Sequence, residues 1–221
     1  MIAWETIDRA RAPDGVELVL ARRGDEWVVR AAGRVLMSSR AHASEEALAS
    51  LGLAAVAGAR EVLVGGLGLG FTLRAVLDLL PATARVTVAE LVPAVVAWNR
   101  GPLAALAGRP LEDPRVRVEE VDVGDVLARD REAWDAVLLD VDNGPSAVAH
   151  AANDRLYGRE GARALRAALR PGGAVAVWSA GQDSAFLGRL ADAGLVPEEH
   201  APRARGGGRG ARHVVVVARR P

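Results

Sequence analysis

Short apolar runs alternate with helical patterns through most of this 221-residue chain, from Glu61 onward. Strands are expected at 62–64, 86–89, 116–118, 136–139 and 174–178, and helices at 72–80, from 93 and at 161–169. Such alternation is typical of a mostly parallel sheet that is covered by helices on both faces. The pattern therefore predicts an α/β fold for this part of the chain.

The patterns on either side of this region predict antiparallel structure. Residues 16–38 hold three short strand-like runs separated by turn formers, which predicts a small antiparallel unit. Near the other end, the runs 195–200 and 213–220 are expected to pair as a hairpin-like edge. The Arg/Gly loop 202–212 between them is interpreted as a mobile connection rather than a nucleic-acid contact, because no aromatic residue is interleaved in it.

The change of pattern places a domain boundary after residue 42. Residues 1–42 are expected to form an N-terminal β-strand extension, and residues 43–221 a Rossmann-like domain. Ser44 is expected to cap a helix that carries Glu45 and Glu46 in its first turn, close to the positive end of the helix dipole.

Composition excludes several classes of function. The 28 Lys and Arg residues balance 28 Asp and Glu residues, so the large positive field that attracts nucleic acid or anionic lipid is absent. The chain has no Cys, which excludes disulfides, thiolate metal sites and a Cys nucleophile. No apolar run approaches the roughly 18 residues of a membrane span, and the N-terminal stretch has no apolar core of a signal peptide. We therefore expect a cytoplasmic protein without a metal site and without a nucleic-acid or membrane partner.

The stretch "VGGLGLGFTL", residues 64–73, is the strongest candidate for a ligand-binding loop. Its glycines follow a predicted strand and precede a predicted helix, so the backbone can approach a ligand beside the positive end of that helix. The spacing is G-x-G-x-G, and Phe71 stands where the dinucleotide fingerprint has its last glycine. A nicotinamide cofactor is therefore disfavoured. The candidate cofactor-binding glycines are Gly65, Gly66, Gly68 and Gly70.

Acidic residues after the next two strands extend this site. Glu90 ends the run "RVTVAE", where a carboxylate can accept both ribose hydroxyls of a nucleoside. Asp122 and Asp125 follow the next predicted strand, where an acid can accept a hydrogen bond from an adenine amino group. Alternatively, one of the two caps the following helix. We prefer Asp125 for the adenine.

The order and spacing of several stretches carry a family resemblance. These stretches are "EVLVGGLGLGFTLRAVL", "VTVAELVPAVV", "DPRVRVEEVDVGD", "WDAVLLDVDNGP" and "LYGREGARALRAALRPGGAVAVW". They resemble the spermidine synthase-like (polyamine aminopropyltransferase) group of the class I S-adenosylmethionine-dependent methyltransferase fold. The resemblance covers nearly the whole chain. It implies a mostly parallel seven-stranded sheet, a preceding antiparallel β unit, and a cofactor that is S-adenosylmethionine or its decarboxylated form.

The resemblance also implies roles for single residues. Glu90 looks like the ribose ligand and Asp125 like the acid that recognises adenine. Asp140, at the end of the strand "DAVLLD", matches the catalytic aspartate that orients and deprotonates the attacking amine, and it also borders the cofactor. An Asp that ends a core strand is a credible general base or cation holder on chemical grounds alone. A turn role is the alternative, since "DVDNGP" is rich in turn formers.

Two departures from the resembling group bear on the reaction. Gly68 stands where the group usually carries an Asp that pairs with the free amine of decarboxylated S-adenosylmethionine and repels the carboxylate of the intact form. In the catalytic loop, neutral Asn143 replaces the second acid, and Asp142 is the candidate to compensate as a catalytic carboxylate.

Four residues are named as candidates for binding the acceptor substrate. His42 lies in a polar segment where the β unit meets the domain, and an exposed position is its alternative. Tyr157 falls in the segment that closes the active site in the resembling group, and core packing is its alternative. The set is His42, Glu46, Asn143 and Tyr157.

These observations predict a transferase that binds S-adenosylmethionine and moves an alkyl group to a small nucleophile. Methyl transfer is favoured, because Gly68 removes the device that excludes the intact cofactor. The alternatives are an aminopropyltransferase that uses decarboxylated S-adenosylmethionine, and a non-catalytic ligand-binding homologue. The expected partner is a small-molecule acceptor, with an amine among the candidates, and a homodimer is possible.

Overall fold

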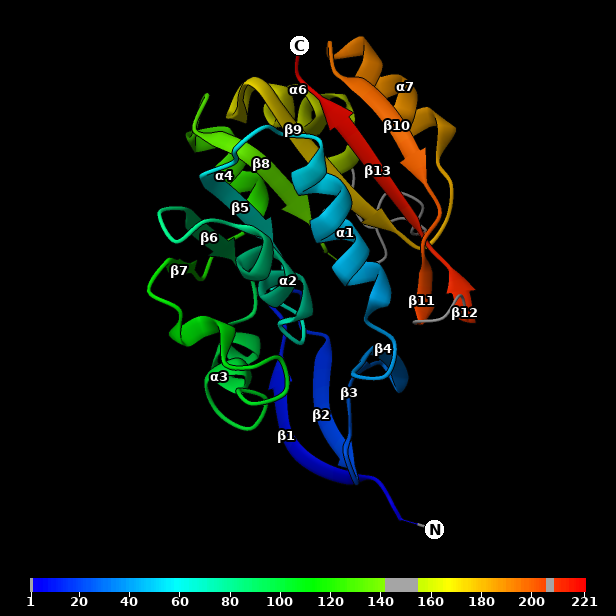
Figure 1. Cartoon of the computed structure of the whole chain (residues 1–221). Coiled ribbons are helices and arrows are strands. Elements are labelled where there is room, and N and C mark those ends of the chain that lie inside the picture. Colours follow the sequence, from blue (N-terminus) through cyan, green and yellow to red (C-terminus); the bar gives the residue numbers. More distant parts are fainter. Residues whose placement is uncertain (1, 142–154, 206–208) are drawn as a thin grey trace.

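The computed structural model describes residues 2–141, 155–205 and 209–221. Two sheets make up most of the described structure: a four-stranded antiparallel sheet at the N-terminus and a seven-stranded, mostly parallel sheet after it (Figure 1). Two short strands pair with each other near the C-terminus. The α/β fold class, the preceding antiparallel unit and the seven strands are as expected.

The N-terminal sheet has one strand more than the sequence pattern predicts. Its strands are β1 (Glu5–Arg11), β2 (Glu17–Arg23), β3 (Glu26–Ala31) and β4 (Arg34–Ser38), paired in that order. Strand β1 pairs only with β2 and has no buried residue, so it carries little of the apolar pattern that marks a strand in sequence. In contrast, Leu18, Leu20 and Val29 turn inward and join the main core.

The second part begins with a helix at Ala43 and alternates strands and helices from Glu61. Its elements are α1 (Ala43–Ala54), β5 (Glu61–Gly65), α2 (Phe71–Leu79), β6 (Arg85–Ala89), α3 (Pro93–Arg100), η1 (Pro110–Glu112), β7 (Val116–Glu119), α4 (Val123–Arg129), β8 (Trp134–Leu139), α6 (Arg159–Ala168), β9 (Leu169–Ser179), α7 (Ser184–Asp192), β10 (Val196–His200), β11 (Arg203–Arg205), β12 (Arg209–Arg212) and β13 (Val214–Arg219).

The strand order of the large sheet is β10-β13-β9-β8-β5-β6-β7. The strands from β9 to β7 pair in parallel, whereas β13 lies antiparallel between β10 and β9. The predicted edge of two antiparallel strands is therefore confirmed. The Arg/Gly loop differs from a simple connection, because β11 and β12 within it pair antiparallel.

Successive residues of the central strands pack into different halves of the core. In β5, Val62 and Val64 join the half that contains α1, α2 and α3, while Leu63 joins the half that contains α4, α6 and α7. In β8, Leu138 faces the first half and its neighbour Leu139 the second. A parallel sheet that is covered on both faces requires strands that are apolar on both faces. This explains why the strand runs read as continuously apolar.

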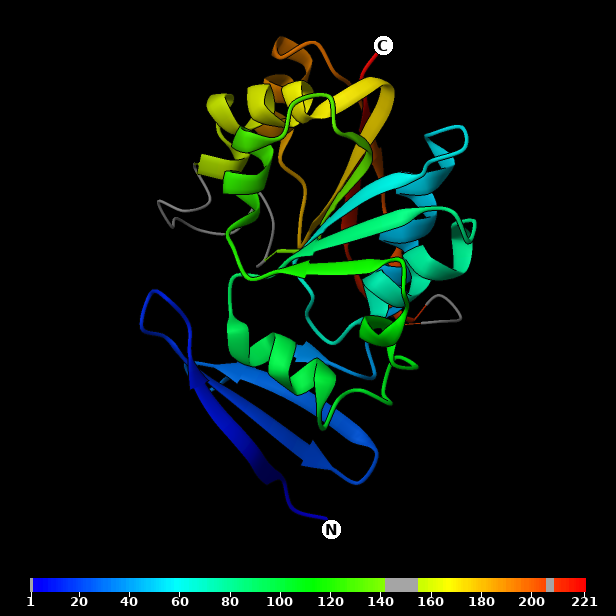
Figure 2. The ribbon, with the colours of Figure 1, turned by 90° about the vertical axis from the view of Figure 1, so that its left-hand side faces the viewer.

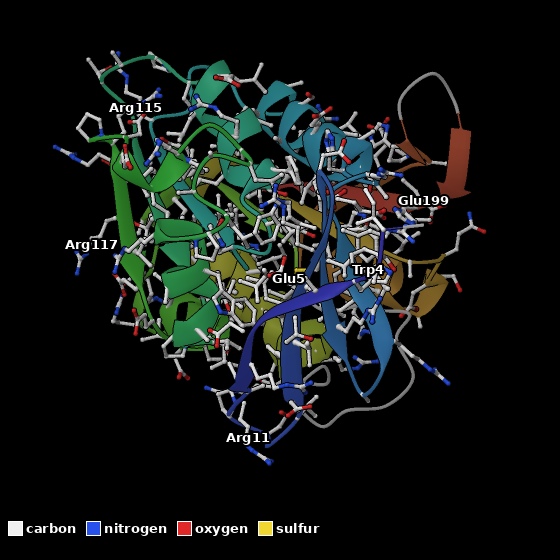
Figure 3. All side chains as sticks on the ribbon, turned by 90° about the horizontal axis from the view of Figure 1, so that it is seen from below. Trp4, Glu5, Arg11, Arg115, Arg117 and Glu199 are labelled. Atoms are coloured by element: carbon white, nitrogen blue, oxygen red, sulfur yellow. The ribbon has the colours of Figure 1, made fainter. Side chains whose placement is uncertain are left out.

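The N-terminal sheet is fastened to the rest of the chain through α3. The indole Nε1 of Trp98 donates a hydrogen bond of 2.7 Å to Asp8 Oδ2 on β1. Figure 2 shows α3 lying between the N-terminal sheet and the large sheet. Seen from below, β1 with Glu5 crosses the centre of the molecule, and Arg117 of β7 and Glu199 of β10 lie toward opposite sides (Figure 3). The small sheet therefore lies below the middle strands of the large one.

The start of α1 differs from the expected capping. The helix begins at Ala43 with His42 as its N-cap residue, and neither residue supplies a side-chain cap. Ser44 lies inside the first turn, fully buried, and its hydroxyl faces other side chains rather than the helix backbone. The prediction of Ser44 as a cap is therefore wrong, and the buried hydroxyl becomes part of the site described below.

Candidate functional site

The candidate site lies at the point where the strand order of the large sheet reverses. The chain proceeds from β5 outward to β6 and β7, and then returns to place β8 on the other side of β5. Open α/β sheets bind ligands outside the carboxyl ends of the strands at such a point. Here the two adjacent strand ends are joined directly, because Asp140 N donates a 2.8 Å hydrogen bond to Gly65 O.

The glycine loop, residues 65–70, connects β5 to α2 at this point. Gly66 has a φ of +86°, and a Cβ built on it would lie 2.3 Å from the backbone oxygen of Asp140. Only glycine allows this combination of positive φ and close approach. Gly70, with a φ of +87°, then begins α2 as its N-cap residue. The loop therefore brings the start of α2 beside the end of β8.

Glu90, which directly follows β6, is hydrogen-bonded to the glycine loop. Its Oε2 accepts a 2.8 Å hydrogen bond from Leu67 N in the glycine loop, and its Oε1 accepts a 2.8 Å bond from Val92 N. The residue is 8% exposed. A carboxylate at the end of this strand is the group that can accept hydrogen bonds from the two hydroxyls of a ribose. The contact of Glu90 with a nucleoside stays a prediction.

Asp122 and Asp125 have different surroundings at the start of α4. Asp122 caps that helix, since its Oδ1 accepts a 2.7 Å bond from Gly124 N. Asp125 is more than half exposed and forms an ion pair with Arg155. The capping alternative therefore holds for Asp122. Asp122 lies nearer in sequence to the end of β7 than the preferred Asp125, and the adenine contact stays a prediction for both.

Asp140 ends β8 directly beside the glycine loop. Its Oδ2 accepts a 2.7 Å hydrogen bond from Thr72 Oγ1 in the first turn of α2. Desolvation raises the pKa of the Asp140 carboxyl above its usual value, while the Thr72 hydrogen bond acts in the opposite direction. A carboxyl that is desolvated but fixed by a neutral donor is suited to accept or share a proton.

A second acid, Glu45, lies near Asp140. Burial and, to a smaller extent, the negative charge of Asp140 raise the pKa of Glu45 to about 7. Ser44 Oγ donates a 2.7 Å hydrogen bond to Glu45 Oε2, and His213 Nδ1 lies 2.9 Å from the same hydroxyl. We refer to Glu45 and Asp140 as the carboxyl pair. Its members and their partners come from α1, α2, β8 and the residue before β13.

The His213 ring completes this group from the far end of the chain. It stacks edge-on against Trp178 with centroids 4.7 Å apart, and burial lowers the pKa of the imidazole. A serine hydroxyl has one proton, so while Ser44 donates to Glu45 the His213 Nδ1 must be the donor to Ser44. A neutral His213 with its proton on Nδ1 satisfies this arrangement.

Three of the four acceptor candidates, His42, Glu46 and Tyr157, lie within the described residues. His42 stacks on Phe71 with centroids 4.1 Å apart, and its Nδ1 lies 2.9 Å from Glu46 Oε1, on the exposed side of α1. Tyr157 is buried, packs edge-on against Phe186, and its hydroxyl donates a 3.4 Å bond to Val141 O. Tyr157 is therefore packed in the core, which was the alternative to a role in binding the acceptor. Asn143 lies outside the described residues, as does Asp142.

Other features of the described residues do not add to this site. No helix among them is long and apolar enough to cross a membrane, and no group of His, Asp or Glu side chains among them is arranged as metal ligands. A surface cavity of about 710 Å³ is lined by Arg131, Arg163, Arg166 and Arg220 together with Glu132 and Asp192. It lies by the amino end of β8, opposite to the end at which open α/β sheets bind ligands.

Comparison with known proteins identifies the family. A model of the spermine/spermidine synthase domain matches residues 41–185. The chain belongs to the spermine/spermidine synthase domain family. The match covers α1 with Glu45, the glycine loop, Glu90 and Asp140, which are the residues that the geometry brings to one end of the sheet.

Curated relatives of this family match over part of their length. Polyamine aminopropyltransferase 2 of Ralstonia nicotianae is 34% identical over 126 residues, which are 56% of this chain and 24% of that protein. Polyamine aminopropyltransferase 2 of Pseudomonas aeruginosa is 35% identical over 122 residues, 53% of this chain and 33% of that protein. The chain thus spans a quarter to a third of the length of these relatives.

Solved structures share the fold over nearly the whole chain. Spermidine synthase from Thermotoga maritima aligns with a TM-score of 0.78 at 17% identity, covering 98% of this chain and 73% of that one. A spermidine synthase in complex with the transition-state analogue AdoDATO aligns with a TM-score of 0.79 at 17% identity, covering 98% and 74%. The spermidine synthase-like fold, including the N-terminal antiparallel sheet, is therefore confirmed.

The sequence pointed to Glu46 as the acid of α1 for the acceptor, and that assignment stays a prediction. The structure places its neighbour Glu45, and not the exposed Glu46, near Asp140. The contacts of Ser44 and His213 with Glu45 were not predicted. One signal was available for α1: apolar Leu48 and Ala49 mark the buried side of the helix, and Glu45 lies three and four residues before them, on the same side.

Proposed function

We propose that this chain transfers an aminopropyl group from decarboxylated S-adenosylmethionine to an amine. The observation that carries the proposal is the position of Asp140, which directly follows β8 and lies beside the glycine loop. Thr72 holds its carboxyl group by a hydrogen bond. The named relatives are polyamine aminopropyltransferases, which favours this reaction over the methyl transfer that the sequence favoured. These activities are those of the relatives, and they support the proposal for this chain.

The residues described above divide into two tasks. The glycine loop and Glu90 would hold the nucleoside, with Glu90 accepting the ribose hydroxyls and the start of α2 lying beside the ligand. Asp140 would face the attacking amine. Both substrates carry positive charge, and desolvated cations need carboxylates close to them. The overall charge of the chain is balanced, so this requirement must be met locally by the acids of the site.

The transfer itself needs little covalent help from the protein. The amine lone pair forms a C–N bond with the aminopropyl carbon, the C–S bond breaks, and its electron pair stays on sulfur, which becomes a neutral thioether. The proton that the nitrogen must lose goes to Asp140. The contribution of the chain is to align the amine with the C–S bond and to exclude water.

The proposal is tested by mass spectrometry of products formed from decarboxylated S-adenosylmethionine and 1,4-diaminobutane. We expect the thioether nucleoside and the aminopropylated amine in equal amounts. Asp140→Asn should lower kcat/KM at least a hundredfold, because general base catalysis contributes about 10²–10⁴. Asp78→Asn is the matched control, since Asp78 is an exposed partner of Arg74 on α2. Unchanged turnover in Asp140→Asn would contradict the proposal.

Methyl transfer from intact S-adenosylmethionine is the second candidate, and one observation favours it. Gly68 carries no acid that would repel the carboxylate of the intact nucleoside. A methylated product from intact S-adenosylmethionine, with no aminopropylated product from the decarboxylated form, would support this candidate and overturn the first. Absence of both products in a chain that binds either nucleoside would support the non-catalytic alternative.

A further inference from the structure

We propose that Glu45 is the second carboxyl group of the acceptor site, and that with Asp140 it binds the ammonium group of an amine acceptor and takes up its proton. This inference rests on the proposed function and names the residue and the acceptor class that the site selects. It also supplies the acid that is missing where Asn143 replaces an Asp of the resembling group. The carboxyl pair brings that acid from α1, far away in the sequence.

Hydrogen bonds from separate elements of the fold converge on the carboxyl pair. Thr72 from α2 holds Asp140 at 2.7 Å, and Ser44 from α1 holds Glu45 at 2.7 Å. His213, which follows the two strands β11 and β12, reaches Ser44 at 2.9 Å. Each acid thus has a neutral hydroxyl donor on one oxygen, and no Arg among the described residues acts on either carboxylate.

Two neighbouring acids without a cation are poorly stabilised as two anions. Burial raises the pKa of both acids, and the charge of Asp140 adds to the rise at Glu45, whose pKa is about 7, so the pair retains a proton near neutral pH. The charged groups that face Glu45 are Asp140 from β8 and Glu46 from its own helix, with His213 reached through Ser44. An ammonium group bound between the acids would replace the retained proton. A diamine or other alkylamine cation is the ligand that this arrangement favours.

The same arrangement suits the proton transfer that precedes attack. An ammonium nitrogen has no lone pair, so it must give one proton to a carboxylate before it can form the C–N bond. A carboxylate whose pKa is near 7 accepts that proton more readily than one with an ordinary pKa. Once Glu45 is protonated, it can donate to the Ser44 oxygen, which has two lone pairs and can also keep accepting from the protonated His213 Nδ1. The proton is then held on Glu45, away from the reacting nitrogen.

Glu46 provides a matched control on the same turn of α1. It is an acid of the same length, but it lies on the exposed side and pairs with His42 at 2.9 Å. Glu45→Gln keeps an oxygen that accepts from Ser44 and resembles the protonated carboxyl, so this variant should fold. Glu46→Gln removes an acid at the next position of the same helix; it leaves both members of the carboxyl pair in place and takes away only the smallest of the causes that raise the pKa of Glu45.

The test is calorimetric titration of 1,4-diaminobutane into the full chain at pH 7, in two buffers that differ in ionisation enthalpy. The titration is run with and without 5′-methylthioadenosine in the nucleoside site. The two buffers together give the number of protons released per amine bound. We expect the chain and Glu46→Gln to release about half a proton or more per site, because a group with a pKa of about 7 is half protonated at this pH. Glu45→Gln should bind at least tenfold more weakly and release fewer protons.

Three outcomes would overturn the inference: Glu45→Gln binding with the affinity and proton release of the unmodified chain, equal losses in Glu46→Gln, or no diamine binding between pH 6 and 9. None of these depends on turnover, so failure here is distinct from failure of the proposed reaction, which is read from products. A second variant, Ser44→Ala, tests the same inference without replacing Glu45 itself. Ser44→Ala removes a hydrogen bond that lowers the pKa of Glu45, so the pH at which proton release is half-maximal should rise.

Discussion

The proposed nucleoside half of the site, formed by the glycine loop and Glu90, and its proposed acceptor half, formed by the carboxyl pair, are built in different ways. In the nucleoside half, Glu90 is satisfied by backbone N–H groups of Leu67 and Val92, which lie 23 and 2 residues away in the chain. In the acceptor half, the contact between Ser44 and His213 joins residues 169 positions apart. The first half is a local motif at two neighbouring strand ends, whereas the second exists only when four elements have packed together.

This difference decides what could be predicted from the sequence. The glycine loop, Glu90 and Asp140 each follow a strand that the apolar pattern marks, so their convergence follows from the rule for carboxyl ends of parallel strands. Glu45 and His213 follow no such strand, and only the helical spacing to Leu48 and Ala49 distinguishes Glu45 from Glu46. Strand β1 was missed for a related reason, since a strand without buried residues has no apolar period.

The largest effect is expected from Gly66→Ala in the nucleoside half. Its Cβ would lie 2.3 Å from the Asp140 backbone oxygen, so the ends of β5 and β8 would have to separate. We expect a loss of about 3 kcal/mol or more in the free energy of unfolding, together with loss of nucleoside binding. Gly172→Ala is the control, because Gly172 has a φ of +78° but nothing within 4 Å of its Cβ. Denaturant unfolding measures the free energy of unfolding of both variants. If both lost the same amount, the positive φ alone, and not the contact with Asp140, would be the cause.

A smaller effect, confined to the same half, is expected from Glu90→Gln. A Gln presents an NH₂ group to one of the two backbone donors that Glu90 now accepts, and it removes the charge. Losing hydrogen bonds to a charged group costs about 2–3 kcal/mol, so nucleoside affinity should fall by about 30- to 150-fold. Proton release on diamine binding, measured without nucleoside, should stay unchanged. If it changed as well, the two halves could not be treated as separate.

Glu45 in the acceptor half is expected to make the free energy of unfolding depend on pH. The pKa of Glu45 is about 7 in the folded chain against 4.5 as its ordinary value, so between these pH values the unfolded chain ionises while the folded chain keeps the proton. Ionisation then favours the unfolded state, and stability from this group is complete below pH 4.5 and is lost as pH rises through 7.

The Glu45→Gln variant cannot ionise at this position, so it does not lose this stability as the pH rises. The difference between the variant and the unmodified chain therefore reports on Glu45 alone. We expect the variant to gain about 2 kcal/mol relative to the unmodified chain between pH 4.5 and 7.5, since one pKa unit corresponds to about 1.4 kcal/mol and the two acids share the effect. The lowered pKa of His213 acts in the opposite direction, but it is common to both chains and cancels. Urea unfolding at pH 5 and 7.5 measures the difference. A constant difference between the two chains would mean that Glu45 is ionised as in solvent.

The smallest effect concerns the one position where the nucleoside half departs from the resembling group. At Gly68 an added Cβ meets only Met37 Sδ, at 3.5 Å, and the φ of +52° lies in the region that Asp and Asn tolerate better than most residues. Gly68→Asp should therefore fold. Its carboxylate would attract the free amine of decarboxylated S-adenosylmethionine and repel the carboxylate of the intact form. We expect the ratio of the two affinities to shift about tenfold toward the decarboxylated form, a change of about 1.4 kcal/mol.

Gly68→Asn separates charge from shape in this experiment, because it places a side chain of the same size at the same backbone position. Competition between the two nucleosides, followed by calorimetry, gives the ratio for each variant. A shift in Gly68→Asp alone would mean that the loop lies against the amino-acid end of the nucleoside and that the glycine relaxes selectivity at this point. An equal ratio in both variants would instead place that end of the nucleoside away from Gly68, and selectivity between the two nucleosides would then have to come from the carboxyl pair in the acceptor half.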